Sequence, residues 1–286
     1  MTAEAIIGDE PMFNFSSIQA LSRITEAILC PPFEWRHVKG GTVTLESAVD
    51  HGGTPGGIYH VPDFAIANYP ITNAQYVKFL DDPNGYSNSH WWQYSSEAAQ
   101  WHRDHPRPKP TAFDGPDLPR TCVSWFDSMA FCHWLPAELK NEEGAQHKNL
   151  PDAHNPATWT VRLPTEQEWQ RAAVGDSGWR YPWGDQLDET RGNYGQQVGY
   201  PTRVGSYPDG KSPYEVMDMV GNVWEWCLTT WGVDGIETSG YTYRLIRGGA
   251  WNVSNPEYLR ATDRGGNSPR GRLNDCGFRC VYCYQC

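Results

Sequence analysis

The sequence predicts a loop-rich globular fold in which short helices and short strands surround an aromatic core. Glycine (28) and proline (22) are frequent enough among the 286 residues to require many turns and loops. Tryptophan (14) and an aromatic content of 13% argue against a disordered chain, which would lack such residues. The sequence has no alternating strand–helix–strand pattern, no GxGxxG motif and no phosphate-binding P-loop, so a doubly wound nucleotide-binding fold is not expected.

The charge distribution limits the partners that we expect. A formal net charge of -11 disfavours nonspecific contact with nucleic acid or with an anionic membrane. Residues 241–286 nevertheless contain seven arginines and no lysine, a pattern that indicates specific forked hydrogen bonds. No apolar stretch is long enough to cross a membrane, and residues 1–13 lack the pattern of a secretory signal. We therefore expect a cytoplasmic protein that binds neither nucleic acid nor membrane.

Four of the eight cysteines lie within the last eleven residues. Cys280, Cys283 and Cys286 have the spacing of metal ligands, but no second pair of cysteines or histidines lies nearby to complete a site. Free thiols are therefore the favoured interpretation, and a metal or redox site is the alternative.

Residues 1–34 form an N-terminal extension with one predicted amphipathic helix. Ser16 and Gln19 have the spacing of a capping box, and Pro31-Pro32 ends the helix. Its apolar face consists of Ile18, Leu21, Ile24 and Ile28. Such a helix must pack on the rest of the chain or on another subunit, so self-association through it is one expectation.

The domain that follows, residues 35–286, has few other predicted elements. Three further helices are predicted from capping patterns, whose paired residues are Thr72 and Gln75, Ser124 and Asp127, and Thr165 and Glu168. Residues 81–120 are rich in proline and tryptophan, and we expect irregular structure there. Short strands are predicted at residues 245–251 and 277–282.

Seven short segments, taken together, resemble one known family. In chain order they are YPITNAQY (69–76), VSWFDSMAFC (123–132), RLPTEQEW (162–169), YPWGD (181–185), MDMVGNVWEW (217–226), RGGAW (247–251) and GFR (277–279). Their order and spacing resemble the formylglycine-generating-enzyme, or sulfatase-modifying-factor, domain. The resemblance implies an α+β, C-type-lectin-like fold with little regular secondary structure.

The sequence departs from this family where its chemistry resides. The enzyme of the family oxidises a substrate cysteine with two copper-binding cysteines shortly after the segment that matches RGGAW. This chain has NVSNPEY at residues 252–258 and no cysteine between Cys227 and Cys276. The related sulfoxide synthases carry their iron histidines largely on an additional N-terminal domain, and His37 is the single histidine near the start of this match. We therefore expect no copper, no iron and no catalytic residue.

A third branch with this fold fits the sequence better. The variable proteins of diversity-generating retroelements carry a replaceable segment between RGG-[SA]-W and GFR, which corresponds to residues 247–282. The resemblance implies a non-catalytic protein that binds a protein or other macromolecule through its 251–276 surface. The residues implied in ligand binding are Trp251, Asn252, Val253, Ser254, Tyr258, Thr262, Asp263, Gly265, Asn267, Ser268, Leu273 and Asn274.

Other interpretations of this segment and of the chain remain open. An ordinary polar loop has a similar composition, and only the gene sequence and its neighbourhood distinguish the two, including whether the gene is phage-borne. The intervening residues would form a fixed frame, which consists of Asn255, Pro256, Leu259, Arg260, Arg264, Pro269 and Arg272. The main alternative function is an oxidoreductase of the same fold with an unrecognised metal site. A third is an accessory or sensor subunit anchored through the N-terminal helix.

Calcium is the cofactor that the resemblance implies. The family binds it at the segment that matches residues 217–226. Here the ligands would be the carboxylates of Asp218 and Glu225 with the carbonyls of Gly221 and Val223, an all-oxygen set that suits this hard cation.

Overall fold

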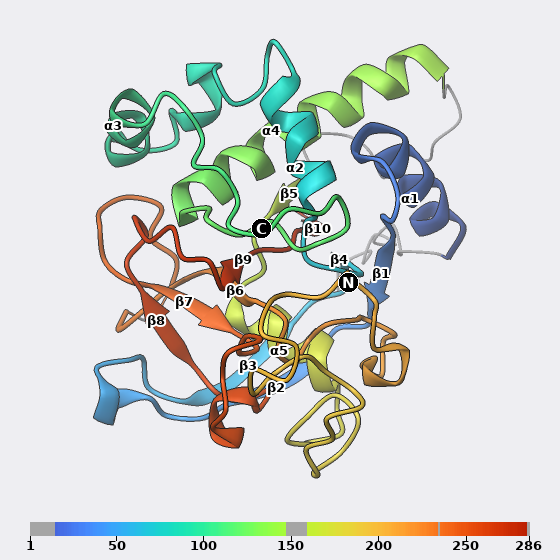
Figure 1. The fold of residues 1–286 in the computed structure, drawn as a ribbon, viewed down its shortest axis with the longest axis vertical. Coiled ribbons are helices and arrows are strands. Elements are labelled where there is room, and N and C mark those ends of the chain that lie inside the picture. The colour runs from blue at the N-terminus through green and yellow to red at the C-terminus, as the bar shows by residue number, and fades with distance from the viewer. Residues whose placement is uncertain (1–14, 147–158, 234, 285–286) are drawn as a thin grey trace, which may run out of the picture.

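A central antiparallel sheet joins distant parts of the chain in the computed structural model, which describes residues 15–146, 159–233 and 235–284. Its strand order is β1-β4-β10-β5 (Figure 1). The strands are β1 (Trp35–Val38), β4 (Phe64–Ala67), β10 (Val281–Tyr284) and β5 (Trp159–Arg162). The last strand of the chain is therefore inserted between β4 and β5.

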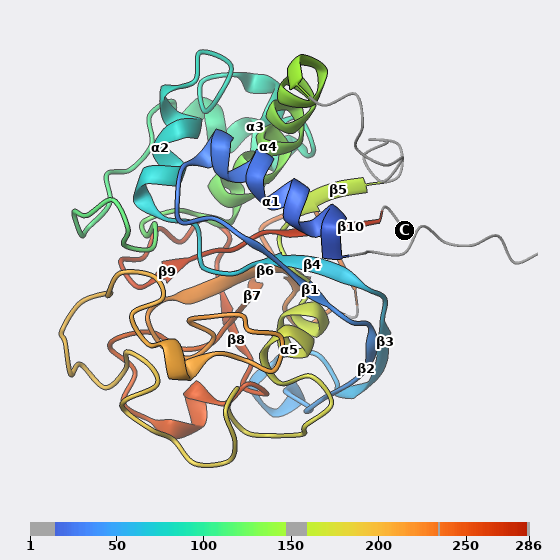
Figure 2. The ribbon, with the colours of Figure 1, turned by 90° about the vertical axis from the view of Figure 1, so that its right-hand side faces the viewer.

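Both faces of this sheet are covered. Ala65 and Ala67 contribute to one hydrophobic cluster, while Phe64 and Ile66 contribute to another, as the alternation of side chains along a strand requires. Four helices lie on the first side and α5 lies on the second (Figure 2). The helices are α1 (Phe15–Leu29), α2 (Asn73–Asp81), α3 (Ser96–Asp104), α4 (Trp125–Gln146) and α5 (Glu166–Val174).

A second sheet has the order β8-β7-β6-β9. It includes short parts of the predicted replaceable segment, residues 247–282, which is called the display segment below. Its strands are β8 (Gly265–Asn267), β7 (Arg244–Arg247), β6 (Trp224–Thr230) and β9 (Cys276–Gly277). β2 (Gly41–Leu45) and β3 (Gly57–Val61) form a separate antiparallel pair. Long loops connect these short elements, as the sequence predicts.

The predicted helix starts are confirmed where a capping box exists. Thr72 with Gln75 and Thr165 with Glu168 form reciprocal capping boxes at α2 and α5. At α4, the Asp127 N–H donates to Ser124 Oγ (3.0 Å). These starts were predictable because each depends on residues only three positions apart.

The N-terminal helix packs on the chain's own body. Ile18, Leu21 and Ile24 are buried in the first cluster, and the Trp35 N–H donates to Ser22 Oγ (2.9 Å). The apolar face that suggested self-association is thus already covered, and self-association stays a prediction. The helix already includes Phe15, so the expected N-cap, Ser16, lies in its first turn instead.

Two other expectations need correction. Residues 81–120 contain α3, whose first turn is capped by Ser95 Oγ accepting from the Ala98 N–H (3.1 Å). The predicted strand at 245–251 stops at Arg247, because Gly248 and Gly249 take φ values of 91° and 75° that an extended strand cannot use. Among the residues described, no helix is long and apolar enough to span a bilayer.

Candidate functional site

Arg264 anchors the middle of the predicted display segment from inside the protein. Its Nε and Nη2 atoms each lie 2.7 Å from the carboxylate of Glu166, and both side chains are almost completely buried. Its Nη1 atom donates to the carbonyls of Glu46 (2.8 Å) and Thr54 (3.0 Å). This one side chain therefore fastens the segment to the start of α5 and to the loop before β3.

Arg272 anchors the end of the segment in a similar way. Its guanidinium donates two 2.8 Å hydrogen bonds to Asp127 at the start of α4 and lies over the Trp101 ring. Burial alone would raise the pKa of Asp127, but hydrogen bonds from Arg272 and Ser124 hold that pKa below its usual value. The carboxylate is therefore charged and paired, and it fixes Arg272 in place.

Two more arginines bind around the part of the segment that precedes Arg264. Arg247 is fully buried and donates to the carbonyls of Ala261 (3.0 Å) and Asp263 (2.6 Å). Arg260 pairs with Glu46 and Glu257, each at 3.0 Å, and remains partly exposed. The arginine-rich composition of this region thus reflects internal forked hydrogen bonding, as the sequence indicates.

The side chains predicted to contact a ligand lie at or near the surface. Ser254, Tyr258, Leu273 and Asn274 are exposed, and Tyr258 reaches 53% exposure. The half-buried members are Trp251, Asn252, Val253, Thr262, Asp263, Gly265, Asn267 and Ser268. The predicted frame residues Leu259 and Pro269 are buried, whereas Asn255 and Pro256 are exposed, which corrects their assignment to a buried frame. Exposed and anchored positions therefore alternate along one stretch of chain.

Gly265 does not fit the expectation of a replaceable position. A Cβ atom built there would lie 3.0 Å from Ile246 Cγ1 on the neighbouring strand. A side chain at this position would therefore require Ile246 to move. Gly265 is a packing glycine of the β7–β8 pair, and its contact with a ligand stays a prediction.

Two loops that the sequence did not connect with this segment border it. Lys109 Nζ donates to the Arg272 carbonyl (2.9 Å), and Phe113 meets the Trp251 ring edge-on at 5.8 Å between centroids. On another side, the Gln196 N–H donates to the Trp251 carbonyl (2.8 Å). These contacts join residues far apart in sequence, and no local sequence pattern predicts them.

The predicted calcium ligands have other partners. Glu225 is fully buried and receives hydrogen bonds from Arg279 Nε (2.7 Å), Arg279 Nη2 (2.6 Å) and Trp169 Nε1 (2.8 Å). Asp218 Oδ2 accepts from the Gly205 N–H (2.7 Å), and burial raises the pKa of Asp218 to about 6. A calcium ion that used the Glu225 carboxylate would have to displace Arg279 from it.

The two other predicted ligands lie in the turn between these carboxylates. Gly221 takes a φ of 73° and its N–H donates to the Gly248 carbonyl (2.8 Å), while the Val223 side chain is buried. Within the described parts of the chain, no three His, Cys, Asp or Glu side chains gather in a metal-binding cluster. Calcium binding stays a prediction that depends on Asp218 and these carbonyls.

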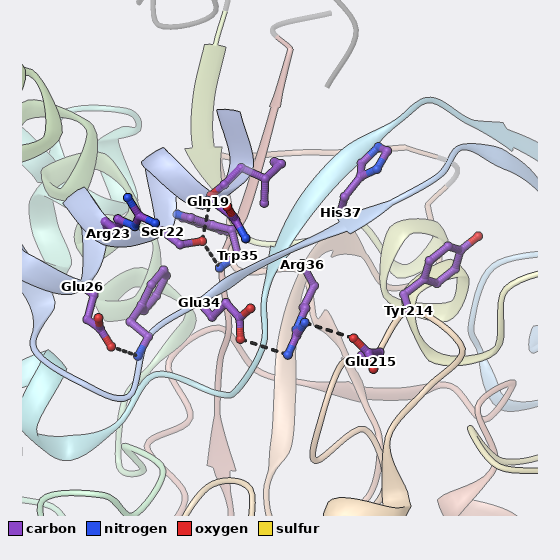
Figure 3. Close-up of a pocket in the computed structure, with 12 residues that line it drawn as sticks. Gln19, Ser22, Arg23, Glu26, Glu34, Trp35, Arg36, His37, Tyr214 and Glu215 are labelled. Carbon is purple, nitrogen blue, oxygen red and sulfur yellow. Dashed lines mark hydrogen bonds and ion pairs between the residues drawn. The ribbon is translucent and has the colours of Figure 1, made fainter. Parts of the chain in front are cut away.

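Surface hollows lie outside the predicted segment. One, of about 580 Å³, lies between α1 and β1 (Figure 3). Within it, Arg36 bridges Glu34 (3.0 Å) and Glu215 (3.2 Å). A second, of about 540 Å³, is lined by parts of β3, β5 and α5. The predicted segment lines neither of these two hollows.

This arrangement defines the class of protein: an α+β domain of the C-type-lectin-like, formylglycine-generating-enzyme-like fold, with few helices and extensive loops. The family model described as "Sulfatase-modifying factor enzyme 1-like domain" matches residues 34–283. The chain therefore belongs to this family, as the seven sequence segments predict.

The relatives that this chain matches include a protein named as an oxygenase and a protein named as inactive. The hercynine oxygenase of Mycobacterium tuberculosis is 33% identical over 245 residues, which cover 80% of this chain and 54% of that protein. The inactive C-alpha-formylglycine-generating enzyme 2 of Mus musculus is 26% identical over 291 residues, covering 86% and 84%. This chain thus spans about half the length of the hercynine oxygenase it matches.

Among solved structures, Treponema denticola variable protein 1 superposes with a TM-score of 0.61 at 22% sequence identity. The match covers 88% of this chain and 95% of the other. At this level of identity the likeness establishes a shared fold.

Proposed function

We propose that this chain is a non-catalytic ligand-binding domain that contacts a protein partner through its 251–276 surface. One observation carries the proposal: buried arginines hold the backbone of this segment, while Ser254, Tyr258, Leu273 and Asn274 remain exposed. Because the fold does not use these four side chains, they can change without loss of structure. A surface of this kind can acquire specificity for different ligands through substitutions at the four exposed positions, while the backbone stays in place.

One feature supports a protein as the ligand. Tyr258 offers a large exposed contact area with little rotamer entropy to lose on binding. The likeness to Treponema denticola variable protein 1 is consistent with this use of the fold.

The second candidate is a domain of an oxidoreductase. The observation that favours it is the 33% identity to a hercynine oxygenase over 80% of this chain. Such an activity requires a metal site, and the described residues do not bring one together. The match covers 54% of that relative.

A displayed library tests the main proposal. The four exposed positions are randomised together, and variants are selected for binding to a purified protein such as lysozyme. We expect folded variants to predominate and specific binders to emerge. The control library randomises Ile58, Val77, Trp179 and Tyr200, which are exposed on other elements. Equal yields from both libraries would contradict a specialised surface.

Two turnover assays address the enzymatic alternatives. The purified protein is given copper and a cysteine-containing sulfatase-type peptide, or iron(II), oxygen and hercynine. We expect neither substrate to be consumed. Formylglycine in the first assay would overturn the argument from the missing cysteines, and consumption of hercynine in the second would establish the second candidate.

A further inference from the structure

Two buried cysteines from distant parts of the chain lie against each other. Cys132 is on α4 and Cys280 directly precedes β10, and their Sγ atoms are 3.6 Å apart. Both side chains are fully buried in the cluster between the central sheet and the four helices. The contact joins residues 148 positions apart in the chain.

The cysteine-rich C-terminus does not act as one cluster. Cys280 and Tyr282 belong to the core on the α4 side of the sheet, whereas Val281 and Cys283 belong to the core on the α5 side. Cys280 and Cys283 therefore point to opposite faces and cannot bind the same metal ion through their thiolates. Cys286 lies outside the described residues. The spacing that suggested a metal site instead places one particular cysteine beside Cys132.

We propose that Cys132 and Cys280 form a covalent modification site: a disulfide bond made when the chain folds in the presence of a small-molecule disulfide oxidant such as oxidised glutathione. One thiolate attacks the oxidant's disulfide, forms a mixed disulfide and releases one reduced thiol. The second thiolate then attacks the protein sulfur of that mixed disulfide and releases the other. The two cysteines lose two protons and two electrons, and the oxidant is reduced to two thiols.

The bond forms most readily before the core closes. In the folded state, burial and the neighbouring Cys280 raise the pKa of Cys132 well above its ordinary value, so its reactive thiolate is scarce. A cross-link over so many residues restricts the unfolded chain strongly and stabilises the fold. In a reducing compartment the same pair stays as two thiols, so its state reports where the protein folds.

The experiment refolds the full chain from reduced denaturant into a mixture of reduced and oxidised glutathione. Free thiols are then alkylated, and the protein is analysed by intact mass and by peptide mapping. We expect a loss of about 2 Da and one linked peptide pair containing Cys132 and Cys280. We also expect the melting temperature to rise by roughly 5–10 °C relative to the reduced protein.

Matched variants separate this bond from other pairings. Cys283→Ser removes a nearby buried cysteine and should leave the cross-link and the melting shift in place. Cys132→Ser and Cys280→Ser should each abolish both. If a variant fails to fold, the wild-type mass decides by itself. Full alkylation of Cys132 and Cys280 after refolding, or a linked peptide that pairs Cys280 with another cysteine, would overturn the proposal.

Discussion

The surface segment 251–275 and the buried motif that follows it use arginine in two different settings. Arg279 is fully buried, pairs with Glu225, and donates to the carbonyls of Ala67, Asn68 and Met217. Arg270, only nine positions earlier, is exposed and lies over the Tyr241 ring. Arg279 is therefore part of the core, whereas Arg270 contacts the protein mainly through the Tyr241 ring.

This contrast shows how a short stretch of chain can be both fixed and variable. This region has little regular secondary structure to supply hydrogen-bond donors to its backbone carbonyls. The buried arginines donate to these carbonyls instead. Within the described part of the chain, the exposed side chains of Ser254, Tyr258, Leu273 and Asn274 make no hydrogen bond or ion pair. Substitution should therefore be costly at the first set and cheap at the second.

The largest loss of stability is expected from Arg279→Ala. The change leaves the Glu225 carboxylate buried without its charge partner, and breaking such a pair costs about 3–5 kcal/mol. Urea unfolding of the variant measures this cost. Arg270→Ala is the matched control and should cost less than about 1 kcal/mol. Similar losses for the two variants would refute the distinction between the regions.

A somewhat smaller loss is expected from Arg264→Ala, in the range of about 2–4 kcal/mol. Its buried pair with Glu166 is also broken, but the site adjoins the partly exposed Thr262 and Asp263, which gives water easier access. The free energy of unfolding in urea checks this value. A change below about 1 kcal/mol would mean that the segment is held by other contacts.

A pH-dependent effect is expected at Asp218. Burial raises its pKa from 3.8 to about 6, so the folded state binds this proton more tightly than the unfolded chain. Its contribution to stability is present below about pH 4 and is lost as the pH rises to about 6. Asp218→Asn should remove this dependence and stabilise the calcium-free protein by about 2–3 kcal/mol at pH 7.

The measurement for Asp218 is the unfolding free energy of both proteins between pH 4 and 8 in the presence of a chelator. Parallel curves would contradict the raised pKa. Repeating the series with calcium tests the predicted ion: calcium should raise the melting temperature of the wild type and leave Asp218→Ala unchanged. A wild-type melting curve indifferent to both calcium and chelator would leave Asp218 without a metal role.

The smallest change in stability is expected from replacing an exposed residue of the segment, Tyr258. Tyr258→Ala should change the unfolding free energy by less than about 0.5 kcal/mol, because the ring is 53% exposed. Thermal melting detects whether this holds. A loss comparable to that of Arg264→Ala would show that Tyr258 belongs to the frame.

The sequence predicted features that depend on neighbours along the chain. The capping boxes at Thr72 and Thr165 are examples, and the fold class followed from seven ordered segments. The α3 helix was missed because the prediction rested on the proline- and tryptophan-rich composition of residues 81–120 and did not use the N-cap at Ser95.

Long-range partners could not be predicted in the same way. Glu225 was assigned to calcium through family resemblance, whereas its carboxylate binds Arg279, 54 positions away. The pairing of Arg264 with Glu166 spans 98 positions. Gly265 was assigned to ligand binding through family resemblance, whereas the position of its missing Cβ lies against Ile246. Each of these three contacts depends on which parts of the chain become neighbours in the fold, and no local sequence pattern specifies that.

The central claim is that the exposed positions of residues 251–275 can be replaced while the anchored positions cannot. A complete single-substitution scan of this segment, with protease resistance as the measure of folding stability, tests it directly. The account predicts near-neutral substitutions at Ser254, Tyr258, Leu273 and Asn274, and strong destabilisation at Arg264, Pro269 and Arg272. The opposite ranking, or uniform tolerance along the segment, would contradict it.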